Sequence, residues 1–268
     1  MILRRVIEHV KTQNWTAVAL DFVIVVVGVF IGIQVANWNE ARIDEGRARA
    51  YLERIVLDLD ADLAQLADRK EFWREVSRYG ETALAYAESA TLEGRTHWSV
   101  LLAFFQASQV AEFITMQATY DELRSAGDLE LIPDLKIRNA MASYYNFGAA
   151  PTVVERPAYR VHVRGIIPMA IQTYIWSSCY SSNQFGIQQM FDCPSPVAAD
   201  TARGIIDGLA GNATLIEELR YWMSTMHVAQ LIANDRLAAA TALKRMIVAY
   251  TQSLPGPTSL GVRDLPAR

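Results

Sequence analysis

Apolar residues follow two different patterns in the first third of the chain. Residues 17–36 form a nearly continuous apolar run that only Asp21 and Gln34 interrupt. About 20 apolar residues in a helix, rising 1.5 Å each, match the roughly 30 Å hydrocarbon core of a bilayer. Beyond this run, apolar side chains recur at three- and four-residue spacings, as on one buried helix face: Leu52, Ile55, Val56, Leu59, Leu63, Leu66, Trp73 and Val76. The patterns predict a transmembrane helix that continues into a long amphipathic helix ending near residue 78, with Gly46 and Gly80 as the expected interruptions.

The remaining chain also favours helices. Residues 97–118 predict a buried core helix, because they are apolar but contain too many polar groups for a second span. Gly127 is expected to end the helix that follows, and a new helix carrying Leu135, Ile137, Met141 and Tyr144 should start after Pro133 and Asp134. Three prolines in 151–176 predict broken helix, with a short strand over 159–163 as an option.

A long C-terminal helix completes the predicted fold. Asn212 has the side chain of an N-cap, and apolar residues at helical spacing continue to about Gln252. We therefore predict an all-α fold, an irregular helical bundle attached to one N-terminal transmembrane helix. Its expected parts are a short cytoplasmic N-terminus (1–16), the transmembrane helix (17–38), a helical extramembrane domain (39–252) and a Pro-rich tail (253–268).

A cleaved signal peptide is the main alternative to the anchor, because Arg4, Arg5 and Lys11 precede the apolar run. Cleavage after Ala36 would place Gln34 three residues before the cut, where a small residue is needed. We therefore favour the anchor. Its ends are marked by Trp15 and Trp38, which suit the two membrane interfaces.

Small and polar residues within the span suggest a helix partner. Gly28, Gly32 and Ala36 recur every four residues and would let another helix approach closely, although a smooth face against lipid is the alternative. Asp21 lies about one turn inside the apolar run. Both Asp21 and Gln34 could make polar contacts with another subunit, or Asp21 could reach the headgroups.

The orientation of the span in the membrane is predicted from its flanking charges and from the two cysteines. Lys and Arg flank both ends of the span in similar numbers, so the positive-inside rule does not decide. Cys179 and Cys193 enclose a polar stretch and predict a disulfide in an oxidising compartment, with two free thiols as the alternative. We expect a protein of the bacterial inner membrane with most of the chain in the periplasm.

No catalytic, cofactor-binding or metal-binding pattern emerges from the sequence. The four histidines are not spaced as paired ligands, and HExxH is absent. Asp58, Asp60 and Asp62 are interpreted as a solvated acidic face, and the basic stripe of Arg156, Arg160 and Arg164 as a solvated surface rather than an anion site. A formal net charge of −4 gives no indication of nucleic-acid binding.

Two stretches carry a family resemblance. In the first, Asp21 leads the apolar run into Asn37-Trp38-Asn39-Glu40. The second has the spacing Tyr-x-Glu-Leu-x-Ser-x-Gly-x-Leu-x-Leu-Ile, represented by Tyr120, Glu122, Leu123, Ser125, Gly127, Leu129, Leu131 and Ile132. Together they resemble an uncharacterised bacterial family of single-span membrane proteins. The resemblance implies an anchored helical domain but no activity, and it covers neither the cysteine loop nor the tail.

Three functions are compatible with these features. The favoured one is a non-catalytic accessory subunit that packs against and stabilises a larger membrane complex through its span and domain, in contact with the lipid bilayer. The alternative is a periplasmic ligand-binding or sensor module that acts through a membrane partner, which a deep pocket near Tyr144, Tyr145 and Trp176 would favour. An unrecognised enzyme is the third. Self-association is a further option, and no cofactor is expected.

Overall fold

The computed structural model describes residues 15–146, 156–183 and 187–254. Helices make up most of them, which confirms the all-α expectation. The chain divides into two compact units, Met1–Tyr51 and Leu52–Arg268. The predicted cytoplasmic N-terminus and nearly all of the Pro-rich tail lie outside the described residues.

Helix α2 (Trp15–Ser89) begins in the first unit and continues in the second. In the described part of the chain it is the one helix long and apolar enough to cross a membrane, with a mean hydropathy of 2.4 in its most apolar window. None of that window is buried by other parts of the protein. This segment therefore differs from a core helix of a soluble protein, which would be covered by its neighbours.

The predicted amphipathic stripe forms one buried face of α2 in the second unit. Leu52, Ile55, Leu59 and Val76 are fully buried there. The predicted end near residue 78 is wrong, because α2 passes through both Gly46 and Gly80 and ends at Ser89. Tertiary packing explains the continuation: a Cβ on Gly80 would lie 1.9 Å from the Met223 sulfur, so this glycine is where another helix approaches closely.

The core helix predicted over 97–118 is shorter than expected. Helix α3 (His97–Gln106) starts with a capping box between Thr96 and Ser99 and ends at Gln106. Residues 108–117 have no regular secondary structure. Some of their backbone carbonyl groups accept hydrogen bonds from side chains of other elements. Trp73 Nε1 donates to the oxygen of Ala111, and Arg69 Nε donates to the oxygen of Glu112. An α-helix would have used these carbonyls internally, so tertiary hydrogen bonds replace helical ones here.

Three short helices follow. Helix α4 (Ala118–Ser125) ends before Gly127, whose φ of 76° confirms the predicted stop, and a 3-10 turn, η1 (Asp128–Leu131), comes next. Helix α5 (Leu135–Asn146) then buries Ile137, Met141 and Tyr144 as predicted, while Leu135 remains exposed.

The strand considered over 159–163 is wrong. Helix α7 (Ala158–Ile166) covers that stretch, and the four-residue spacing of Tyr159 and Val163 places both side chains in the core. Pro157 and Pro168 precede α7 and α8 (Met169–Ser178), where a proline does not interrupt helical hydrogen bonds. Two short antiparallel strands that were not predicted follow, β1 (Tyr180–Ser182) and β2 (Gln188–Met190), with Tyr180 paired to Met190.

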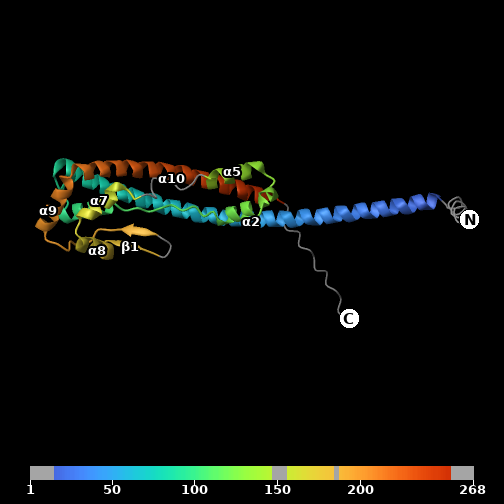
Figure 1. Cartoon of the computed structure of the whole chain (residues 1–268), viewed down its shortest axis with the longest axis horizontal. Coiled ribbons are helices and arrows are strands. Elements are labelled where there is room, and N and C mark those ends of the chain that lie inside the picture. The colour runs from blue at the N-terminus through green and yellow to red at the C-terminus, as the bar shows by residue number, and fades with distance from the viewer. Residues whose placement is uncertain (1–14, 147–155, 184–186, 255–268) are drawn as a thin grey trace, which may run out of the picture. The chain divides into compact units, whose positions relative to one another are not determined.

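Two further helices close the second unit. Helix α9 (Ala199–Ala210) packs against α3. Helix α10 (Ala213–Ser253) begins at the predicted cap, where the Asn212 side chain accepts from the Leu215 amide. Figure 1 shows α10 alongside the part of α2 in this unit, and the pairs Ser77–Gln230 and Asp60–Lys244 show that the two helices run antiparallel.

Candidate functional site

The apolar part of α2 presents an uncovered surface. Nothing lies within 4 Å of a Cβ built on Gly28 or Gly32. Asp21, Gln34 and Ala36 are also exposed, and Trp38 is 62% exposed with the Arg42 guanidinium 5.0 Å from its ring. The side chain of Trp15, the other predicted interfacial anchor, lies outside the described residues. No contact within the described chain therefore occupies the predicted helix-packing row.

Asp62 is fully buried, which contradicts the prediction of a solvated acidic face. Its carboxylate accepts from the Met116 amide at 2.8 Å and from the Tyr144 hydroxyl at 2.7 Å. Burial raises the pKa of the Asp62 carboxyl, while these two hydrogen bonds act in the opposite direction. Asp60 points to the surface as expected, where it pairs with Lys244.

Arg236 completes this buried polar cluster. Its Nη1 donates to the Tyr144 carbonyl and its Nη2 donates to the Thr115 hydroxyl. The guanidinium lies 4.5 Å from the centre of the Tyr144 ring and 5.5 Å from that of Phe113, within cation–π range. The cluster ties α2, the irregular segment, α5 and α10 together. Sequence reasoning missed it because Arg236 and Asp62 are far apart in the chain.

A groove between α5 and α10 lies beside this cluster. Its volume is about 350 Å³, and Tyr144 and Arg236 form part of its wall. Apolar side chains dominate the rest of the lining. Of the residues expected near a ligand pocket, Tyr144 lines this groove, but Tyr145 and Trp176 do not. Tyr145 instead stacks on Tyr120, and Trp176 packs against Phe105 and Tyr180.

A larger and more polar groove lies between α2 and α10. It has a volume of about 610 Å³ and is lined by both acidic and basic side chains together with Met223 and His227. Burial raises the pKa of Glu75 in this lining. The charges are mixed, with Glu71 already paired to Arg74, so the groove has no single electrostatic preference.

The predicted basic stripe divides between surface and interior. Arg156 is exposed. Arg160 and Arg164 are partly buried, which contradicts their assignment to a solvated surface. Arg160 donates to the Ser108 carbonyl, while Arg164 donates to the Ser108 hydroxyl and the Gln109 side chain. Burial, with a contribution from Arg160, lowers the pKa of Arg164 to about 9. These arginines hold α7 against the end of α3 and are not arranged to receive an anion.

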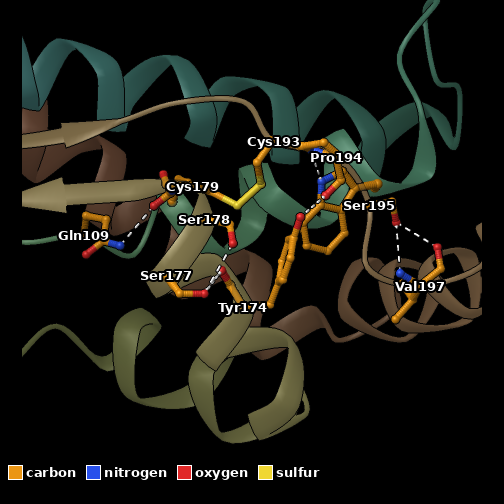
Figure 2. The surroundings of a disulfide bond; sticks show 11 residues. Gln109, Tyr174, Ser177, Ser178, Cys179, Cys193, Pro194, Ser195 and Val197 are labelled. Carbon is orange, nitrogen blue, oxygen red and sulfur yellow. Dashed lines mark hydrogen bonds between the residues drawn. A yellow bond between two sulfur atoms is a disulfide. The ribbon is translucent and has the colours of Figure 1, made fainter.

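The structure joins Cys179 and Cys193 in a disulfide (Figure 2). Cys179 is fully buried and follows α8 directly. Two side chains hold the segment after β2 in place. Trp98 Nε1 donates to the Cys193 carbonyl, and the Tyr174 hydroxyl donates to the Pro194 carbonyl. Gln106 also donates to the Cys179 carbonyl. The disulfide therefore closes the base of the β1–β2 hairpin, and the hydrogen bonds from Trp98, Gln106 and Tyr174 fasten the hairpin to α3 and α8.

The histidines of the described chain do not converge. His162 Nδ1 lies 3.0 Å from Glu218, and His162 Nε2 lies 3.3 Å from the Asn212 amide. His227 lines the polar groove, while His97 begins α3. Within the described residues, no group of three or more His, Cys, Asp or Glu side chains is placed to hold a metal ion.

Comparisons with protein-family models, with curated proteins and with solved structures found no match to this chain. The family resemblance of the two sequence stretches therefore stays a prediction.

Proposed function

We propose that the protein is a non-catalytic, single-pass membrane subunit that stabilises a larger assembly by packing against other membrane proteins. The observation that carries the proposal is the apolar stretch of α2, where large side chains such as Phe22, Val29 and Ile31 are more than half exposed. Exposed apolar surface of this extent is unfavourable in water, so it requires lipid or another protein around it.

The glycine row supports a helix partner in addition to lipid. Gly28 and Gly32 leave open space on one face of α2. Lipid tails are as apolar as leucine, so association in a bilayer depends on close backbone packing rather than on the hydrophobic effect. A face of small residues supplies that packing, and we infer that it receives a helix of an integral membrane subunit.

The disulfide supports a periplasmic position for the second unit. Disulfides form and persist in oxidising compartments and are rare in the cytosol. A bond between Cys179 and Cys193 therefore favours a bacterial inner-membrane protein whose helical domain faces the periplasm.

The test replaces the small residues by larger ones. We expect Gly28→Leu combined with Gly32→Leu to release the protein from its assembly, because two isobutyl groups would hold the helices apart. The measurement is gentle detergent extraction of native membranes, size fractionation, and mass spectrometry of the proteins that co-migrate at fixed ratio.

The matched control is Val23→Leu combined with Val27→Leu, which enlarges α2 on the face away from the glycines by helical geometry. This pair should leave co-migration unchanged, and both variants should retain the thermal unfolding of the wild-type domain. Unchanged co-migration of the glycine variant would refute helix packing through this row. Migration of the wild type alone would refute the accessory-subunit proposal itself.

A further inference from the structure

The lining of the groove between α5 and α10 is polar around Arg236 and apolar from there toward Met246. Arg236 Nη1 donates to the carbonyl of Tyr144, so the C-terminal part of α5 lies beside the middle of α10. Ser143, Tyr144, Asp235 and Arg236 gather there. The rest of the lining is apolar apart from backbone: Ala140, Ile232, Ala239, Ala242, Leu243 and Met246.

Small side chains keep the apolar end open. Ala140 stands on α5, and Ala239 and Ala242 stand on α10, with Leu243 and Met246 completing the wall. From Asp235 to Met246 the helix rises about 16 Å. A volume of about 350 Å³ lies at the lower end of the roughly 300–1,000 Å³ found for ligand pockets, which are mostly apolar with a few placed polar groups. The dimensions suit one short linear chain.

Most of the polar groups at the other end are already engaged. The Tyr144 hydroxyl donates to Asp62, and both terminal nitrogens of Arg236 donate within the protein. The Arg236 guanidinium also lies against two aromatic rings. An incoming anion would have to compete with these contacts.

Asp235 differs from its neighbours in this lining. It is exposed at the mouth of the groove, and within the described chain it has neither an ion pair nor a side-chain hydrogen bond. A carboxylate only accepts hydrogen bonds and favours a positive charge nearby. Asp235 is therefore the charged side chain of this lining that a ligand head can reach without displacing an existing contact, and it favours a cationic head.

We propose that the α5–α10 groove binds a linear amphiphile with a cationic head, its apolar chain lying over Ala239 and Ala242 and its ammonium group against Asp235. This site goes beyond the proposed packing of the membrane helix, because it uses only residues of the second unit. The apolar chain of the ligand contributes affinity through contact with the groove. Its head group determines which of several ligands of equal length binds most tightly.

The test compares three ligands that differ only in the head: octylamine, octanol and octanoate. The full-length protein is embedded in lipid nanodiscs, and binding is measured by equilibrium dialysis of labelled ligand, with empty nanodiscs subtracted. We expect octylamine to bind most tightly and octanoate most weakly. Asp235→Asn should weaken octylamine binding about two- to fivefold, the range of an exposed ion pair, and leave octanol unchanged.

Two neighbouring alanines supply a matched control for the apolar end. Ala239→Leu should fill the groove and abolish binding of all three ligands. Ala238→Leu makes the same change one position earlier, at an exposed residue outside the lining, and should leave binding intact. Both variants should unfold at the wild-type temperature, because neither alanine is buried.

Three results would overturn the proposal. Preference for octanoate would show that Arg236, rather than Asp235, sets the charge of the site. Equal binding to Ala239→Leu and wild type would place the ligands elsewhere. A dimer of the wild type that dissociates in Ala239→Leu, detected by light scattering, would show that a second copy of the chain occupies the groove.

Discussion

At the scale of single residues, burial changes what a polar side chain does. Asp58, Asp60 and Asp62 are spaced by two along α2, yet Asp60 reaches the surface while Asp62 is fully buried and holds Met116 and Tyr144. The two hydrogen bonds offset part of the free-energy cost of burying the charged Asp62 carboxylate. Burial nevertheless favours the neutral, protonated form of this side chain. Arg160 and Arg164 likewise act inside the domain.

The raised pKa of Asp62 predicts a pH dependence of stability. Because the pKa is higher in the folded state than the ordinary value of 3.8, folding takes up a proton as the pH falls, so acid favours the folded state through this group. We expect the unfolding free energy of the wild type, relative to Asp62→Asn, to rise as the pH falls from 7 through the raised pKa toward 3.8. Denaturant unfolding of the full chain at a series of pH values measures this difference.

The matched control is Asp60→Asn, which removes an exposed pair with Lys244 worth at most about 1 kcal/mol. A difference between wild type and Asp62→Asn that stays constant, or falls on acidification, would contradict the assignment of Asp62 as a carboxyl whose charge is disfavoured by burial.

At the scale of elements, tertiary contacts decide where helices end and how closely they pack. Helix α3 stops at Gln106, and the following segment supplies carbonyls to Arg69 and Trp73 on α2. In contrast, α2 continues past Gly80, where the absence of a side chain makes room for Met223 of α10. A glycine in a helix usually weakens it by about 0.5–1 kcal/mol relative to alanine. At Gly80 this lower helix stability is combined with a close approach of α2 and α10.

Gly80 and Met223 should therefore be strongly coupled. We expect Gly80→Ala to destabilise the wild type by about 1 kcal/mol, because the new methyl group displaces the Met223 side chain. In a Met223→Ala background the same change should stabilise the domain by roughly 0.5–1 kcal/mol, as alanine favours the helix. A double-mutant cycle of unfolding free energies measures the coupling.

Gly208→Ala in α9 is the control for helix propensity alone, because a Cβ there would meet nothing within 4 Å. It should stabilise the chain whether or not Met223 is present. Equal effects of Gly80→Ala in both backgrounds would show that the α2–α10 distance does not depend on this glycine.

At the scale of the whole molecule, the two units place different demands on their surroundings. The described part of the first unit exposes an apolar helix that needs lipid or protein around it. The second unit has its own core and is fastened by one disulfide. A chain with both features suits a membrane facing an oxidising compartment.

The proposed periplasmic position of the second unit predicts the redox state of the cysteines in the cell. When intact cells are quenched with acid and the unfolded protein is then treated with a thiol reagent in denaturant, we expect Cys179 and Cys193 to stay unlabelled, and to be labelled once a reductant is added first. Removing the bond by Cys179→Ala with Cys193→Ala should lower the unfolding free energy by about 3 kcal/mol, since the bond closes a loop of about 15 residues. Labelling of both cysteines without reductant would contradict the periplasmic assignment.

Several features of this protein followed from local sequence alone. The all-α class, the single apolar helix, the buried stripe of α2, the stop at Gly127 and the cap at Asn212 depend on periodicity and on interactions within a few residues, which a sequence displays directly. These predictions were correct because helical hydrogen bonds and helix caps join residues that are near neighbours in the sequence.

Other features depended on residues far apart in the chain. The shorter α3, the helix over Ala158–Ile166, the burial of Asp62 and the groove between α5 and α10 arise from contacts between distant segments. The hydrogen bond from Tyr144 to Asp62, for example, joins residues 82 positions apart. Local helix or strand propensity does not indicate which distant residues will contact one another. Only the packed structure therefore determines which polar residues enter the core and where a site forms.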